Sequence, residues 1–293
     1  MKRISIAFTI ILAACLLLTA CKAATPTTEP DTNFNADRAY QDVVNQVAFG
    51  PRVPESDAHS QAVDYIISEL MSAGWQIDIQ DTDIQGHRVI NITAFREKVD
   101  QPIILAAHYD SRMVNDAETP LSELSQPVPG ANDGASGVAV LLEIARVLPA
   151  NKTDVWLVFF DAEDQGNLDG WGWTLGSQAY ADALTVTPRS LVLLDMVGDA
   201  DLNIYRESSS DATLKNEIWL TAASLGYSDQ FINSEKYTMI DDHTPFLEKG
   251  IQAVDLIDFD YPYWHTTADT ADKVSPQSLE IVGNVILTWL KDK

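Results

Sequence analysis

The sequence has only two cysteines, and both, Cys15 and Cys21, lie near its N-terminus. The rest of the chain therefore offers no thiol for a disulfide, for a zinc thiolate site or for a cysteine nucleophile. A metal held by the remaining residues must use histidine, aspartate and glutamate side chains.

Basic residues are also scarce, with 19 Lys and Arg against 43 Asp and Glu and a formal net charge of −24. Such a surface repels phosphate backbones and anionic headgroups, so the composition argues against a nucleic-acid partner and against a face that lies on anionic lipid. Solubility is a sufficient explanation for most of these charges.

Long apolar runs are absent except at the N-terminus, where residues 4–18 follow Lys2 and Arg3. This run is too short to remain in a bilayer and has the composition of a signal peptide, which we place at residues 1–20. We therefore expect a protein that leaves the cytoplasm, and removal of Lys2 and Arg3 makes its net charge still more negative.

The signal ends in LTAC, residues 18–21, which resembles the bacterial lipobox. We expect Cys21 to become the first residue of the mature chain and to carry lipid. The protein would then be attached to the membrane through this lipid alone. An ordinary secretory signal, with Cys21 incidental, is the alternative. The expected location is the bacterial cell envelope, outside the cytoplasm.

Residues 21–35 are rich in Thr and Pro and suit a flexible tether, and residues 36–293 have the apolar content of one catalytic domain. Apolar patterns predict helices at 35–50, 56–74, 134–148, 177–184, 209–226 and 275–292. Short apolar runs predict strands at 89–95, 102–111, 154–163, 190–198 and 253–259. Because several of these strands are apolar on both faces, we expect an α/β fold, a three-layer sandwich around a mixed, mostly parallel sheet.

Acidic residues and histidines collect where the predicted strands end. The strand ends carry His108, Asp110, Asp161, Glu163, Asp164, Asp195 and Asp199, and the loops add Asp133 and His265. Ligands of such sheets bind at the carboxyl ends of the strands. Two imidazoles with several carboxylates and no thiol are the ligand chemistry of a zinc hydrolase.

Several motifs then occur in one order: FGPRVP, HYDS, GANDGASGVAVLLEIAR, FFDAED, LGS, LLDMVG, DDHTPF and WHT. With them, residues 36–293 resemble the metallopeptidase family of zinc aminopeptidases and glutaminyl cyclases, whose fold is an α/β sandwich. The resemblance implies that Asp133 bridges or anchors the metal site. It implies that Asp164 and His265 complete one zinc site and that His108 and Asp195 offer a second.

The same resemblance makes Glu163 the general base and acid, while Asp110 is placed to orient the imidazole of His108. Asp164 departs from the Glu often found at its position, although a shorter carboxylate can still bind metal. Asp161 receives no role. His243 is expected to make a structural hydrogen bond, and His59 and His87 are expected to be surface or packing residues.

The family contains two chemistries, and both act on free peptide N-termini. Aminopeptidases hold two zinc ions and use the counterpart of Glu163 to take a proton from the attacking water. Glutaminyl cyclases use one zinc and convert N-terminal glutamine to pyroglutamate with release of ammonia. The ligand positions do not separate the two, so the expected cofactor is one zinc for a cyclase and two for an aminopeptidase.

Two features favour the cyclase. Asp241 matches an acidic residue that shares a hydrogen-bond network with the catalytic Glu, and Trp264 lies beside His265 in an aromatic segment. Trp264, with Trp171 or Trp173, could line a small pocket for a glutamine side chain, although core packing remains an alternative for Trp171 and Trp173. A non-catalytic lipoprotein that binds peptide or metal is the rival from another class, and the retained Glu163 speaks against it. The oligomeric state is left open.

Overall fold

The computed structural model describes residues 32–117 and 126–293. The expected signal peptide, Cys21 and most of the expected tether lie outside the described residues. Within the described part of the chain, no helix combines the length and the apolar character needed to cross a bilayer.

The helices of the described structure are α1 (Ala36–Ala48), α2 (Asp57–Ser72), α3 (Ala135–Val147), α4 (Leu175–Ala183), α5 (Ala212–Ser224), α6 (Thr244–Glu248) and α7 (Pro276–Lys291), with a short 3-10 turn, η2 (Ala271–Lys273). The strands are β1 (Gln76–Ile84), β2 (His87–Phe95), β3 (Ile103–His108), β4 (Val155–Phe160), β5 (Ser190–Asp195), β6 (Ile204–Arg206), β7 (Phe231–Glu235) and β8 (Ala253–Ile257).

Six strands form the main sheet in the order β1-β2-β4-β3-β5-β8. The strands β4, β3, β5 and β8 run parallel, whereas β1 and β2 form an antiparallel hairpin that pairs antiparallel with β4. The two remaining strands, β6 and β7, make a small separate sheet. The parallel half of the main sheet therefore delivers the ends of four strands to one edge.

The central strands are buried on both faces, as their continuous apolar runs predict. In β3, the side chains of Ile103, Leu105 and Ala107 belong to one apolar core, while Ile104 and Ala106 belong to another on the opposite face. The period-two alternation of a strand thus divides one short run between two helical layers.

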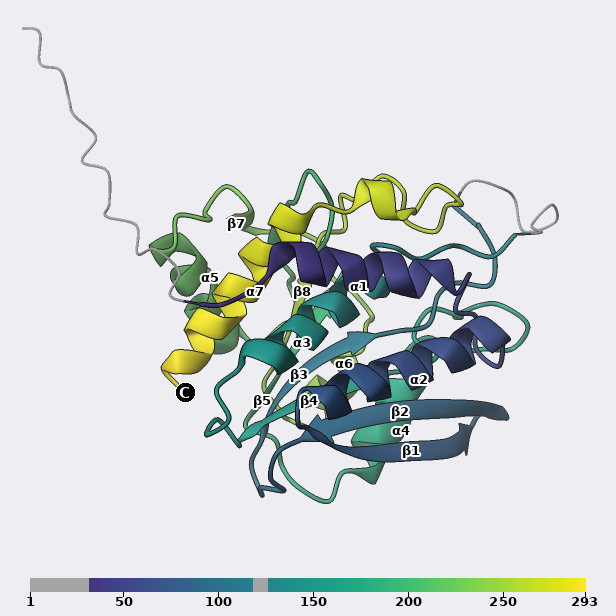
Figure 1. The fold of residues 1–293 in the computed structure, drawn as a ribbon, viewed down its shortest axis with the longest axis horizontal. Coiled ribbons are helices and arrows are strands. Elements are labelled where there is room, and N and C mark those ends of the chain that lie inside the picture. The colour runs from purple at the N-terminus through teal and green to yellow at the C-terminus, as the bar shows by residue number, and fades with distance from the viewer. Residues whose placement is uncertain (1–31, 118–125) are drawn as a thin grey trace, which may run out of the picture.

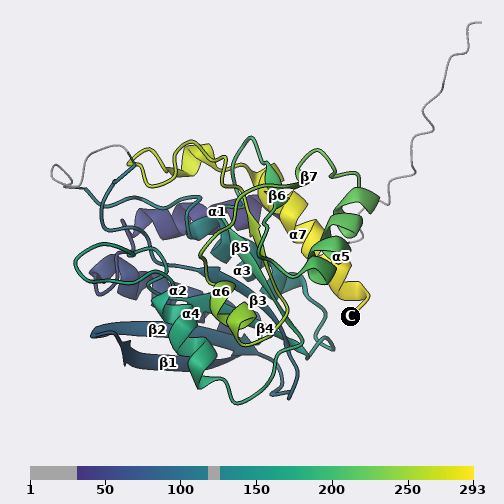
Figure 2. The same ribbon diagram turned by 180° about the vertical axis from the view of Figure 1, so that it is seen from behind.

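Figures 1 and 2 show these layers from opposite sides. Helices α1, α2, α3 and α7 cover one face of the sheet, and α4 and α6 cover the other. The two cores match this division, because one includes residues of α1, α2, α3 and α7 and the other includes Tyr180 of α4 and Phe246 of α6. The predicted three-layer α/β sandwich is confirmed.

The predicted tether is too long by two residues at its C-terminal end. The ring of Phe34 is buried so closely against α7 that a Cβ on Gly283 would lie 2.2 Å from it. The side chain of Asn35 accepts a hydrogen bond from the Arg38 N–H and caps α1. Polar composition concealed these contacts, because one buried ring and one capping amide leave no periodic pattern in the sequence.

The strand β1 was not predicted. All its residues are half-buried or exposed, and the strand lies at the edge of the sheet, where it pairs with β2 alone. An edge strand has fewer side chains to bury, so its pattern is weaker than that of β3 or β4.

Candidate metal centre and catalytic pocket

The backbone turns sharply at three places where the site is built. Ala162 is the second residue after β4 and has φ +51°, Met196 directly follows β5 with φ +45°, and His265 has φ +55°. Left-handed backbone is unfavourable for residues with a Cβ, and it recurs at functional sites where the surrounding structure holds it in place. The turn at Ala162 separates the direction of Asp161 from those of Glu163 and Asp164.

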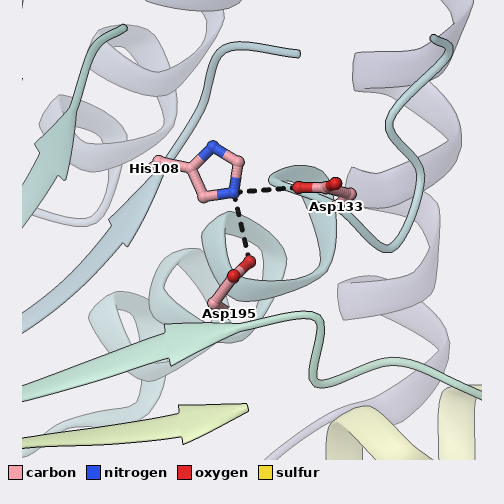
Figure 3. A group of neighbouring side chains, drawn as sticks. All are labelled: His108, Asp133 and Asp195. Atoms are coloured by element: carbon pink, nitrogen blue, oxygen red, sulfur yellow. Dashed lines mark hydrogen bonds and ion pairs between the residues drawn. The ribbon is translucent and has the colours of Figure 1, made fainter. Parts of the chain in front are cut away.

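The first group of potential ligands lies around His108. His108 Nε2 is 3.2 Å from Asp133 Oδ1 and 3.1 Å from Asp195 Oδ1, and Figure 3 shows both carboxylates directed at this one ring nitrogen. The ring is fully buried. On its other side, Nδ1 is 3.4 Å from Asp110 Oδ1, so the structure places Asp110 where an orienting carboxylate was expected.

The second group shares Asp133 with the first and adds Asp164 and His265. His265 Nε2 is 2.8 Å from Asp164 Oδ1 and 3.9 Å from Asp133 Oδ2. His265 Nδ1 lies 2.9 Å from Asp116 Oδ1, which favours a proton on Nδ1 and leaves Nε2 directed at the two ligand carboxylates. Burial lowers the pKa of His265, but the charge of Asp164 and the bond to Asp116 outweigh it and raise the pKa to about 9.

The residues of the second group fit a divalent metal. Its donors are one imidazole nitrogen and two carboxylates, a hard to borderline set that zinc accepts. Asp133 Oδ2 and Asp164 Oδ2 are buried and have no hydrogen-bond partner in the described structure. Buried anionic oxygens without a partner are costly, and a cation between these side chains would satisfy them.

Glu163 and Asp241 face the same cavity as the second ligand group. Burial, together with the negative charges of Asp241 and Asp164, holds the pKa of the Glu163 carboxyl well above its usual range. Burial and the charge of Asp195 raise the pKa of Asp241 to about 7. Two neighbouring carboxyls whose pKa values are both raised can take up and release a proton during a reaction.

The cavity encloses about 210 Å³. Its lining comprises Asp133, Glu163, Asp164, Trp173, Asp195, Met196, Met239, Ile240, Asp241, Ile257, Phe259, Trp264 and His265. All three residues of the second ligand group therefore reach the cavity, whereas His108 of the first group does not line it. A small space with apolar walls and a few acidic groups is suited to one short side chain.

Two of the three predicted tryptophans lie at this cavity. The ring of Trp264 stacks on His265 with centroids 3.7 Å apart, and Trp173 lies nearly parallel to the same imidazole at 6.2 Å. Of the alternatives Trp171 and Trp173, the structure places Trp173 at the cavity, whereas Trp171 does not line it and instead stacks on His87 at 3.8 Å. The sequence places Trp171 and Trp173 two residues apart, and only the loop conformation decides which of them faces the metal site.

Three supporting residues have no role in the sequence analysis. Asp116, which bonds His265 Nδ1, also pairs with the guanidinium of Arg112. Asp269 accepts hydrogen bonds from the backbone N–H of Asn132 and of Asp133, at 2.9 and 3.1 Å. Neither aspartate lies at the end of a predicted strand, which is the position that pointed to most of the other acidic residues of the site.

The third supporting residue is Arg52 of the FGPRVP motif. Its buried guanidinium donates to the carbonyl oxygens of Tyr109, Pro129 and Gly130 at 2.9, 2.8 and 2.6 Å. These bonds tie the end of β3 to the loop that carries Asp133. The FGPRVP motif thus has a structural role that its residues alone do not reveal.

The remaining histidines do not line the cavity. His59, expected to be a surface or packing residue, is buried and contacts Asp161 at 2.8 Å, so it packs inside the domain and gives Asp161 the partner that sequence reasoning did not find. His243 makes the structural contact that was predicted, at 3.1 Å from Ser209 Oγ. Asp199 is not part of either metal group.

Comparison with known proteins agrees with this geometry. The model of "Peptidase family M28" matches residues 89–290, which is more than half of the chain. The chain belongs to peptidase family M28. The resemblance inferred from the sequence motifs is thereby confirmed.

Among solved structures, this M28 protein is similar to a Zn-dependent exopeptidase from Parabacteroides distasonis, with 34% identity, a TM-score of 0.82 and coverage of 89% of this chain and 99% of the other. It is similar to a glutaminyl cyclase from Bacteroides thetaiotaomicron, solved with N-acetylhistamine, with 32% identity, a TM-score of 0.83 and coverage of 89% and 98%.

The aminopeptidase YwaD of Bacillus subtilis is 30% identical over 203 residues, which are 63% of this chain and 39% of that protein. Both chemistries of the family are thus represented among the relatives. The family and its neighbours imply zinc, and the two ligand groups that share Asp133 are where this M28 protein could hold it.

Proposed function

We propose that this protein is a zinc-dependent glutaminyl-peptide cyclotransferase that acts on peptide or protein N-termini. The observation that carries the proposal is where the unpartnered oxygens lie. The buried oxygens of Asp133 and Asp164 without a partner both belong to the group that lines the cavity with His265. Asp195, the carboxylate that belongs to the group around His108 alone, has no such oxygen. This distribution favours one zinc, held by Asp133, Asp164 and His265.

When bound there, zinc supplies a positive charge that polarises the side-chain amide carbonyl of an N-terminal glutamine. The cavity between Trp173 and Trp264 has the size and the apolar walls to hold that side chain and to limit access of water. Exclusion of water matters, because water would compete with the α-amine for the same carbon.

Glu163 performs the proton transfers. It takes a proton from the α-amine as the nitrogen forms a bond to the amide carbon, and it returns the proton to the amide nitrogen as the carbon–nitrogen bond breaks. The products are a pyroglutamyl peptide and ammonia, and no other reactant is needed. The raised pKa of Glu163 suits both halves of this exchange, and the neighbouring charge of Asp241 helps to keep it raised.

The second candidate is a di-zinc aminopeptidase. It is favoured by the first ligand group, because His108, Asp133 and Asp195 also bring ligand atoms within 4.8 Å of one another. In that case Glu163 would take a proton from water rather than from an amine, and the N-terminal residue would be released.

One experiment with two substrates tests the proposal. A glutaminyl peptide is followed for ammonia release, an aminoacyl anilide is followed for hydrolysis, and zinc per chain is measured by plasma mass spectrometry. We expect faster ammonia release and close to one zinc. Cleavage of the anilide without ammonia, together with two zinc ions, would establish the aminopeptidase instead. Zinc binding without either product would support the binding lipoprotein.

We also propose that the protein is lipid-anchored in the bacterial cell envelope through Cys21, with no nucleic-acid partner. The support is the LTAC sequence at residues 18–21. The variant Cys21→Ser should move the protein from the membrane fraction to the soluble fraction, because the acyl chains would be lost. If the variant still sediments with membranes in mild salt, this anchor is not what holds it.

A further inference from the structure

The cavity has one lining residue whose exposure is unusual. Ile240 is 70% exposed, while the other residues of the lining are buried or half-buried. Among the described residues, only Met71, Ile79 and Leu220 are other large hydrophobic side chains with such exposure, and none of them lines this cavity. Ile240 therefore marks the rim at which the cavity opens to solvent.

The backbone on both sides of Ile240 is held by hydrogen bonds. On one side, the Met239 N–H donates to Glu207 Oε1 at 3.1 Å. The Glu207 carboxylate is buried and is itself fixed by the backbone N–H groups of Ser209 and Ser210, at 2.9 and 2.7 Å. The loop before Ile240 is thus tied to a buried anchor.

On the other side, the Asp241 N–H donates to Thr244 Oγ1 at 3.2 Å, and the Asp241 carbonyl accepts from the Thr244 N–H at 2.8 Å. This pair of bonds connects Ile240 to the start of α6. A side chain presented from such a backbone loses little freedom when it meets a ligand, so the contact is preorganised.

The chemistry changes from the interior of the cavity to its rim. The interior carries the carboxyls of Glu163 and Asp241, which suit the reacting amine. The lining that includes the exposed Ile240 also includes the half-buried apolar side chains of Met239 and Phe259. A peptide whose first residue fills the cavity must leave it through this rim, where its second residue meets an apolar surface.

We propose that Ile240 is a specificity-determining residue and that the preferred substrates are peptides with an apolar second residue. The inference rests on the proposed action at peptide N-termini. Acidic second residues are disfavoured, because their carboxylate would replace an apolar contact and would lie near the acidic groups of the cavity.

The test is a series of peptides with N-terminal glutamine followed by Leu, Phe, Gly or Asp, with kcat and KM measured for each. For the parent protein we expect kcat/KM for Leu to exceed that for Gly by roughly three- to tenfold, carried mainly by KM. The variant Ile240→Ser should reduce this ratio to about twofold or less, mainly by raising KM for the leucine peptide. Leu220→Ser, which is equally exposed but remote from the cavity, is the matched control.

An unchanged Leu-to-Gly ratio in Ile240→Ser, or an equal change in Leu220→Ser, would overturn the inference. Absence of ammonia in every reaction would contradict the cyclase assignment. In that case, the preference for the second residue is measured on a second peptide series that begins with leucine, and release of free leucine is the readout. If neither product forms, both the proposed function and the inference fail.

Discussion

The two imidazoles of the site are held in different ways. His108 ends a central strand, is fully buried and does not line the cavity. His265 lies on a loop with left-handed backbone, is stacked against Trp264 and lines the cavity with Asp133 and Asp164. The sequence presents both as equivalent ligands, but in the structure only the reachable group, Asp133, Asp164 and His265, has its imidazole at the cavity.

The carboxylates that orient the two imidazoles, Asp110 and Asp116, also have different partners. Asp110, beside His108, also accepts hydrogen bonds from the backbone N–H groups of Glu163 and Asp164, at 3.1 and 3.3 Å. Asp116, beside His265, binds Arg112 and the imidazole. Asp110 thus holds the backbone at Glu163 and Asp164 in place, whereas Asp116 orients His265, a ligand of the reachable group. The two sets of ligand residues thus share Asp133 and differ in whether their imidazole lines the cavity.

The largest expected effect is the difference between a variant of Asp164 and a variant of His108. Asp164→Ala should lose zinc and reduce activity by at least about 10³-fold, because the reachable group loses a ligand and with it the metal charge. His108→Ala should keep one zinc and remain within about tenfold of the parent. Zinc per chain and kcat/KM are measured together, with thermal unfolding as the check that each variant folds. Equal losses in both variants would mean that two metals act together.

Next in size is the effect of Glu163→Gln. The amide keeps the shape of the side chain but cannot accept the proton, so kcat should fall by about 10² to 10⁴ while zinc is retained. Asp241→Ala should also lower kcat without loss of zinc, because the charge of Asp241 helps to keep the pKa of Glu163 raised. A Glu163→Gln variant that turns over at nearly the parent rate would remove this carboxyl from the mechanism.

A smaller effect is expected from Asp116→Asn. The weaker acceptor at His265 Nδ1 should raise the Kd for zinc by about 10- to 100-fold, as for other carboxylates that orient a metal-binding histidine. Competition with a chromogenic chelator measures this Kd. Asp81→Asn, at an exposed ion pair with Arg88 in the hairpin, is the control and should leave it unchanged. Parent-like affinity in Asp116→Asn would make Asp116 a loop residue only.

The smallest expected effect is a difference in kcat/KM between variants of Trp264 and Trp171. Trp264→Ala removes a wall of the cavity and the ring stacked on His265, and it should lower kcat/KM by about tenfold. Trp171→Ala, which loses only its contacts outside the cavity, should remain within about twofold. Steady-state kinetics on one glutaminyl peptide suffices, and the reverse order of effects would contradict the placement of the two rings.

The amino-acid sequence by itself indicated the sheet and most of the acids of the site. The strands β3, β4 and β5 are buried on both faces, so their apolar runs are continuous, and parallel strands bring the residues at their ends to one edge. His108, Glu163, Asp164 and Asp195 could be placed together for this reason. The motifs added Asp133 and His265, which lie on loops and have no such periodicity.

The tertiary structure alone decided which of these residues substrate can reach and what holds them. Asp116 meets His265 across 149 positions of the chain, and Asp269 meets Asp133 across 136. No local pattern encodes such contacts, because they depend on how the loops pack after the sheet has formed. The same holds for Trp173 and Ile240, whose positions at the cavity follow from backbone turns and anchoring hydrogen bonds. Hydrophobic periodicity determines the layers, but the directions of side chains on loops are fixed only by long-range packing.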